Sequence, residues 1–228
     1  MTIPSFLRPA LAALALAAAL PAAHAVDVTL DFSGNICGVA GASVCGNYAQ
    51  IGQNYGDIAG VLDVSHRSVV AATGVTHESF LKYWANDYSN LVGVAWGGAD
   101  QTGYYSEMTF TPGAGQQVTL VGFDFGDYAN RNYASSVSIF DLGGSLLWNG
   151  GSFDPGLTST HFAPSITSSN GLVLRWGPDG YDVGIDNIQL TVGTATTAPT
   201  APVPEPETWA LLLGGLAVVG SVARRRRG

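Results

Sequence analysis

Short strand-like segments separated by turn residues recur along most of this chain, and they limit it to an all-β fold. Each segment is rich in β-branched and aromatic residues, and Gly, Asn, Asp and Pro stand between them. The segments are 26–32, 60–64, 91–96, 104–110, 117–125, 136–141, 145–148, 171–176 and 184–192. Residues 77–84 fit one or two helical turns or a further strand. This spacing predicts an antiparallel β-sandwich or a barrel, and we predict one β-sandwich domain over residues 26–193.

The last of these segments contains a carboxylate on its apolar face. Asp186 shares the strand phase of Ile188, Leu190 and Val192, so we expect it to be buried. A buried carboxylate needs a partner, because an isolated one is very costly. One candidate is a Ca²⁺ ion with oxygen ligands from Asp186, backbone carbonyls and Asp27 or Asp31 of the first strand. The other is a hydrogen bond from a backbone amide near the start of the strand.

This final segment also resembles a known kind of domain. The sequence Gly-Ile-Asp-Asn-Ile-Gln-Leu at 184–190 is similar to the closing strand of jelly-roll domains related to carbohydrate-binding modules. The pair Asp31-Phe32 and the stretch 123–126 support the similarity. The resemblance implies a jelly-roll-like sandwich whose first and last strands pair and hold a structural calcium through Asp31 and Asp186. No other cofactor is expected.

Both ends of the chain have the features of export signals. Arg8 precedes an apolar run at 10–20, and Ala-His-Ala at 23–25 is the small-x-small pattern that signal peptidase cleaves. Residues 1–25 are therefore predicted to be a signal peptide, and mature protein should begin at Val26. Residues 194–203 are rich in Thr, Ala and Pro and predict an extended linker.

The last part of the chain, 204–228, has three parts in a fixed order. Pro204, Glu205 and Pro206 should be extended and accessible, because proline disfavours a helix. The uncharged stretch 208–223 would rise about 24 Å as a helix, slightly less than a ~30 Å hydrocarbon core. Trp209 stands where an aromatic anchor would lie at the lipid interface. The chain then ends in a basic cluster of Arg224, Arg225, Arg226 and Arg227 before a final glycine.

This order resembles the PEP-CTERM sorting signal of Gram-negative bacteria, which an exosortase recognises and cleaves. The resemblance implies that the Pro204–Pro206 region is the processing site and that 208–223 is a single transmembrane helix. The helix would anchor the chain transiently in the inner membrane, with the domain in the periplasm. The processed protein would then reach the cell surface or the medium. The alternative is an ordinary C-terminal membrane anchor with a Pro-rich linker.

Charge and cysteine usage agree with export. Residues 26–203 carry fifteen acidic side chains against four basic ones, a balance of −11, which argues against nucleic acid as a partner. Surface aspartates that keep the protein soluble are the simpler explanation for this excess. The chain has two cysteines, Cys37 and Cys45, and they should form a disulfide in an oxidising compartment.

No catalytic motif stands out. His66, His77 and His161 are dispersed, without a HExxH, GxSxG or P-loop pattern around them. Residues 124–128 are predicted to form a turn between two strands with solvated carboxylates. Aromatic residues in loops are better candidates, because sugars stack on flat apolar faces. The candidates for glycan contact are Tyr128, Tyr133 and Tyr181, although each also fits a place in the core.

Three classes of function follow. The first is a non-enzymatic exported protein, sorted by an exosortase and associated with the cell surface, exopolysaccharide or biofilm matrix. The second is a glycan-binding module. The third is a secreted hydrolase, which requires a cleft lined by convergent carboxylates.

Overall fold

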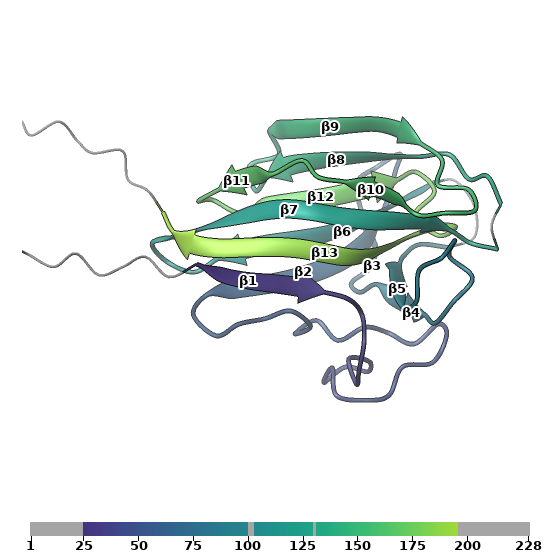
Figure 1. The fold of residues 1–228 in the computed structure, drawn as a ribbon, viewed down its shortest axis with the longest axis horizontal. Coiled ribbons are helices and arrows are strands. Elements are labelled where there is room, and N and C mark those ends of the chain that lie inside the picture. The colour runs from purple at the N-terminus through teal and green to yellow at the C-terminus, as the bar shows by residue number, and fades with distance from the viewer. Residues whose placement is uncertain (1–24, 100–102, 130, 196–228) are drawn as a thin grey trace, which may run out of the picture. The chain divides into compact units, whose positions relative to one another are not determined.

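Two antiparallel sheets form the fold in the computed structural model, which describes residues 25–99, 103–129 and 131–195 (Figure 1). The first sheet has the order β10-β7-β13-β5-β4, with β1 also paired to β13 and β11 to β7. Its strands are β1 (Val26–Leu30), β4 (Lys82–Trp84), β5 (Val94–Trp96), β7 (Gln116–Asp127), β10 (Thr160–Phe162), β11 (Ile166–Ser168) and β13 (Val183–Thr194). We call it the β7–β13 sheet.

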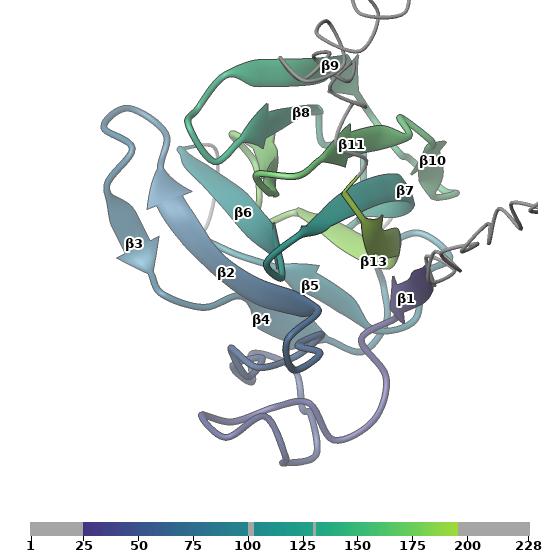
Figure 2. The ribbon, with the colours of Figure 1, turned by 90° about the vertical axis from the view of Figure 1, so that its left-hand side faces the viewer.

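The second sheet has the order β3-β2-β6-β12-β8-β9, and we call it the β6–β12 sheet. Its strands are β2 (Leu62–Val70), β3 (Thr76–Glu78), β6 (Tyr104–Pro112), β8 (Ser135–Asp141), β9 (Leu146–Phe153) and β12 (Leu172–Gly177). Figure 2 shows β2 and β6 on one side of the domain and β7, β13 and β1 on the other. The predicted antiparallel, jelly-roll-like β-sandwich is confirmed.

The core lies between the two sheets and is built from alternate residues of the long strands. Phe125 of β7 and Trp176 of β12 are both fully buried, and their rings meet 5.7 Å apart between the sheets. The Trp176 indole donates a 2.9 Å hydrogen bond to the Val183 carbonyl, so its polar atom is satisfied inside the core. Burial of such large side chains is the main force that holds the layers together.

Each of the nine predicted strand segments coincides with a strand, and the structure adds three-residue strands that the sequence pattern did not reveal. The ambiguous stretch 77–84 contributes to two strands, β3 and β4, and forms no helix. Strands β10 and β11 were not predicted, because three residues are too few to show a period of two. Strand β1 pairs with β13 as expected, with Leu30 opposite Ile188.

The predicted orientation of Asp186 was wrong, although the residue is buried. Ile185 and Ile188 both belong to the core, so the simple alternation breaks between them. Asn187 has a left-handed φ of 52°, and the pairing of β13 with β7 shifts register between Asp186 and Gln189. This β-bulge turns Asp186 away from the core while leaving it only 4% exposed.

The long connection between β1 and β2 contains the predicted disulfide. Cys37 and Cys45 are joined, and Cys37 is almost fully buried against the main core. In Figures 1 and 2 this connection, coloured purple to blue, runs along the lower side of the domain. The crosslink therefore fixes a segment that has no regular strand of its own.

The predicted signal peptide, the linker beyond residue 195, the sorting motif and the transmembrane helix 208–223 lie outside the described residues. Residues 25–99, 103–129 and 131–195 contain no helix that is long and apolar enough to cross a membrane.

Candidate functional site

Three carboxylates line a cavity of about 390 Å³ on the outer face of the β7–β13 sheet. Asp124 on β7 pairs directly with Asp186 on β13 and with His161 on β10, so the three side chains form a row across neighbouring strands. Asp31, one residue beyond the end of β1, lines the same cavity. The structure thus brings together Asp31 and Asp186, which the sequence predicted as a pair, and adds Asp124 to them.

Hydrogen bonds fix this row in place. His161 Nδ1 lies 2.7 Å from Asp124 Oδ1, and the Asn187 side-chain amide donates to Asp124 Oδ2 over 2.9 Å. The Asn187 backbone amide donates to Asp186 Oδ1 over 2.7 Å. Asp31 Oδ1 accepts a 2.8 Å bond from the Ser33 hydroxyl. The second alternative for Asp186 was a hydrogen bond from a backbone amide, and the Asn187 amide provides one.

The environments of the carboxylates differ in their effect on protonation. Burial raises the pKa of Asp186 to about 7, and the negative charges of Asp124 and Asp31 act in the same direction. Hydrogen bonds from Ser33 lower the pKa of Asp31. The two carboxylates therefore differ in acidity, because Asp186 titrates near neutral pH while Asp31 loses its proton more readily than an ordinary aspartate.

The cavity fits a calcium ion only in part. Among the described residues, no group of three or more His, Cys, Asp or Glu side chains is arranged to hold a metal ion. Both Asp124 oxygens already have protein partners. Asp31 and Asp186 would leave most of the six to eight oxygen ligands that Ca²⁺ takes to water or backbone carbonyls. Calcium at Asp31 and Asp186 stays a prediction.

A second group of residues forms an aromatic cluster beside the main core. Trp84, Trp96, Tyr88, Tyr128 and Tyr181 surround a space of only about 10 Å³. The rings of Trp84 and Tyr128 meet edge to face 5.2 Å apart, and those of Trp96 and Tyr181 4.8 Å apart. Two of the predicted glycan contacts, Tyr128 and Tyr181, therefore meet here as packing residues.

The third predicted glycan contact is elsewhere. Tyr133 packs against the main core, and its backbone amide donates to Asp127 Oδ2. The structure thus places Tyr128 and Tyr181 together and Tyr133 apart from them. The indole N–H groups of Trp84 and Trp96 are buried, and neither has a hydrogen-bond partner within the described part of the chain.

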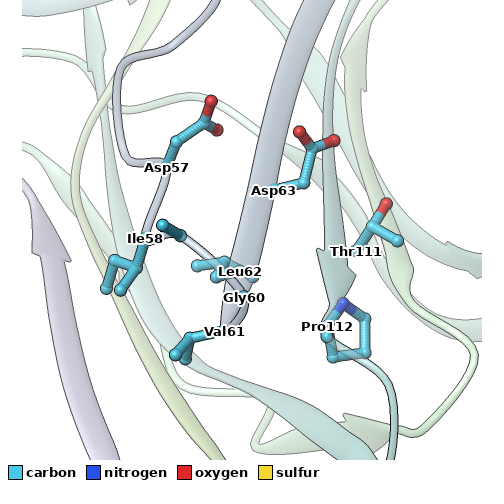
Figure 3. Close-up of a pocket in the computed structure, with 10 residues that line it drawn as sticks. Asp57, Ile58, Gly60, Val61, Leu62, Asp63, Thr111 and Pro112 are labelled. Carbon is cyan, nitrogen blue, oxygen red and sulfur yellow. The ribbon is translucent and has the colours of Figure 1, made fainter.

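Two further cavities lie near β2. One, of about 490 Å³, is lined by hydroxyl, amide and guanidinium groups, with Arg67 at its wall. Arg67 is held by Glu107, which also pairs with Arg175, so a buried carboxylate lies between two arginines across three strands. The other, of about 240 Å³, is shown in Figure 3, where Asp57 and Asp63 stand at its rim. Asp57 Oδ1 is already used, because it accepts a 2.8 Å bond from the Val64 amide.

The histidines serve structure or pair with an acid. His66 is buried and bonded by Gln53 and by the Leu81 amide, and burial lowers its pKa to about 4. His77 packs against the Tyr104 ring. His161 contacts Asp124 through its Nδ1 atom. The two residues are far apart in sequence, and they become neighbours because β10 pairs with β7.

The comparison with protein families bears on the tail. The PEP-CTERM protein-sorting motif matches residues 202–227, which overlap the predicted 204–228. The tail is a PEP-CTERM sorting signal. Recognition by an exosortase, export and membrane-anchored processing at the cell envelope follow from this PEP-CTERM motif.

Comparisons for the sandwich itself are weak. No curated protein matches the chain. Among solved structures, it is similar to the crystal structure of the enzymatically active domain of bacteriophage CBA120 tailspike protein 4. That similarity has 12% identity and a TM-score of 0.30, and it covers 71% of this chain and 21% of the tailspike chain. At this level it carries no argument about function.

Proposed function

We propose that this chain is a non-enzymatic protein of the cell surface or the exopolysaccharide and biofilm matrix, released or attached there after exosortase processing. The PEP-CTERM motif at 202–227 carries the proposal. Three features of the domain support it. The Cys37–Cys45 disulfide suits an oxidising compartment, the balance of −11 suits a soluble exported domain, and the linker at 194–203 would hold the domain away from the membrane.

Processing is tested by replacing Pro204, Glu205 and Pro206 together with alanine in the native host. We expect an uncleaved precursor that stays with the membrane fraction, because we propose that the exosortase recognises and cleaves the chain at the Pro-Glu-Pro segment. Mass spectrometry of the mature C-terminus of the wild-type protein would place the cut. A matched control replaces Thr197, Pro199 and Thr200 of the linker with alanine, outside the matched motif, and we expect it to be processed normally.

Normal processing of the triple-alanine variant would contradict the proposal and would identify the tail as a membrane anchor only. Matrix association has a separate readout. The processed protein should co-fractionate with isolated exopolysaccharide and should be released when that polymer is degraded. Recovery of all mature protein in polymer-free medium would refute the matrix assignment without affecting the sorting signal.

One observation favours a second candidate, the secreted hydrolase. Such an enzyme requires convergent carboxylates, and the cavity on the β7–β13 sheet contains Asp31, Asp124 and Asp186. Assays of the purified protein on a polysaccharide panel would decide between the two candidates. Activity that disappears in both Asp31→Asn and Asp186→Asn would support the hydrolase, and inactivity throughout would support the non-enzymatic protein.

A glycan-binding module receives less support from the aromatic residues. Tyr128 and Tyr181 present their rings to neighbouring tryptophans and surround almost no free space, so neither offers an open stacking platform. Any polysaccharide contact would therefore use other parts of the surface. A structural Ca²⁺ held in part by Asp31 and Asp186 is included in the proposal as a stabilising ion.

A further inference from the structure

The cavity of about 490 Å³ beside β2 has an arginine in its wall and, among the described residues that line it, no carboxylate. The cavities of about 240 and 390 Å³ both contain aspartates. Residues 26–203 carry fifteen acidic side chains against four basic ones, so a cavity with this composition is unusual for the domain. We call it the Arg67 cavity. Its charge favours a ligand that the other two cavities would repel.

Strand register builds the wall of the Arg67 cavity. Ser65 and Arg67 lie two residues apart on one face of β2, and they pair with Thr109 and Glu107 of β6. Strand β3 lies on the other side of β2, where the Thr76 hydroxyl accepts a 3.3 Å bond from Arg67 Nη1. Figure 2 shows β3, β2 and β6 next to one another. Polar side chains of three neighbouring strands therefore meet at this cavity.

The floor of the Arg67 cavity is firmly held and carries no charge at neutral pH. Gln53 Oε1 accepts a 3.2 Å bond from the His66 amide, and Gln53 Nε2 donates 2.9 Å bonds to the carbonyls of His66 and Ser79. The His66 ring is also fixed, because its Nδ1 accepts a 2.9 Å bond from the Leu81 amide. Burial lowers the pKa of His66 to about 4, so the ring is neutral. Arg67 is therefore the source of charge in this cavity.

Several polar groups of the wall are available to a ligand. The hydroxyls of Ser65, Ser79 and Thr109 form no hydrogen bond with another described residue. The Arg67 side chain is 49% exposed, and its Nε is held by Glu107 over 2.7 Å, whereas its Nη2 has no partner within the described part of the chain. A guanidinium only donates hydrogen bonds, and a hydroxyl can donate or accept. A fixed cation beside free hydroxyls suits a ligand that has both a carboxylate and hydroxyl groups.

We propose that the Arg67 cavity binds a carboxylate-bearing sugar unit of an acidic polysaccharide. Arg67 binds the carboxylate, because a guanidinium and a carboxylate form short, charge-assisted hydrogen bonds. Ser65 and Thr109 bind hydroxyl groups of the same sugar. This inference rests on the proposed place of the protein in an exopolysaccharide matrix, and it names the class of polymer that the protein contacts there.

A second arginine favours a polymer over a free sugar. Glu107 is 1% exposed and also pairs with Arg175 of β12, whose guanidinium lies 5.6 Å from the Tyr105 ring and 4.9 Å from the Phe140 ring. Because β2 and β12 flank β6, Arg67 and Arg175 lie roughly 10 Å apart across the sheet. Two arginines around one glutamate leave a net charge of +1 on this part of the sheet. A polysaccharide with a carboxylate on successive units can contact both arginines.

The test measures binding of the full-length protein in detergent to immobilised alginate, a polymer of uronic acids, with neutral dextran and dextran sulfate in parallel. Alginate should bind most tightly. Arg67→Gln should weaken alginate binding about tenfold, and its fold should survive because Glu107 keeps Arg175. Ser65→Ala leaves the ion pairs intact and should weaken binding about threefold. Arg131→Gln is the matched control, because it removes the same charge at an exposed loop position and should bind as wild type does.

The outcomes separate this site from the proposed function. Equal loss of alginate binding in Arg67→Gln and Arg131→Gln would overturn the site, because binding would then follow overall charge. No binding of alginate by wild type, or equally tight binding of either dextran, would also overturn it. If Arg67→Gln co-fractionates with isolated exopolysaccharide as wild type does, the matrix assignment stands and this site is refuted. If wild type binds alginate through Arg67 but never co-fractionates with the native polymer, the matrix assignment fails and the site stands.

Discussion

Replacing Asp186 with asparagine should stabilise the protein above neutral pH and change its stability little in acid. Asp186 is 4% exposed, and burial with the nearby charges of Asp124 and Asp31 raises its pKa from 3.8 to about 7. The folded protein therefore binds a proton that the unfolded chain releases between these two values. Stability from this group is fully present below pH 3.8 and is lost as the pH rises through about 7.

The size of the effect follows from the pKa difference. A shift of about three pKa units, at about 1.4 kcal/mol each, corresponds to a cost of ionising Asp186 on the order of 4 kcal/mol. Because the cavity is open to water, which screens the charge, we expect about half of that to be observed. Asparagine keeps an oxygen that accepts the Asn187 amide bond and removes the charge, so this cost disappears.

The assay is urea unfolding of wild type and Asp186→Asn at about pH 4 and about pH 8.5, with EGTA present throughout. The variant should be more stable by about 2 kcal/mol at the higher pH and nearly equal at the lower one. Asp63→Asn, at an exposed position, is the control and should show no such pH dependence. Equal destabilisation at both pH values would refute the reasoning and would show that Asp186 is needed as a carboxylate. If calcium is added and Asp186 holds it, the sign reverses and the variant becomes the less stable protein.

Two further predictions concern the scaffold. Glu107→Gln should lower the free energy of unfolding by about 1–3 kcal/mol. This is less than the cost of breaking a fully buried pair, because Arg67 and Arg175 are 49% and 36% exposed and can be hydrated again. Urea unfolding measures the change, and an unchanged midpoint would mean that the ion pairs contribute nothing to stability. Replacing Cys37 and Cys45 together with alanine should cost about 2.5 kcal/mol through the lost crosslink, and reduction of wild type should reproduce most of that loss. A reduced wild-type protein as stable as the oxidised one would contradict this.

The strand pattern was predictable because long strands bury one face, and a period of two then appears directly in the sequence. Strand β2 is an example, since Leu62 and Val64 are buried while Asp63 between them is exposed. The pattern failed where the backbone departs from regular pairing. The bulge at Asn187 reverses the face of Asp186. Asparagine tolerates a left-handed backbone, but an asparagine inside an apolar strand pattern does not by itself predict a bulge.

The site residues were harder to predict, because they come together through strand register. His161 and Asp124 are distant in sequence and meet only where β10 pairs with β7. The stretch 124–128 was predicted to be a turn with solvated carboxylates, which is wrong for its first four residues. β7 continues to Asp127, with Asp124 paired to histidine on one face and Asp127 buried on the other. Asp and Gly at 124–127 are typical of turns, so the sequence did not show that β7 extends to Asp127.

The acidic residues of the domain therefore affect its stability as well as its solubility. Among the described residues, the buried charged side chains are Glu107, Asp127, Asp179, Asp182 and Asp186, and all are acidic. Glu107 is paired with two arginines, the Asp179 carboxylate accepts a bond from the Asp182 amide, and the Asp186 carboxylate accepts one from the Asn187 amide. Burial raises the pKa of Asp127 and of Asp186 to about 7, and such carboxylates make the free energy of unfolding depend on pH. The PEP-CTERM signal implies export, so the domain is exposed to the pH outside the cytoplasm. Its stability should thus depend on that environment more than its sandwich fold alone would indicate.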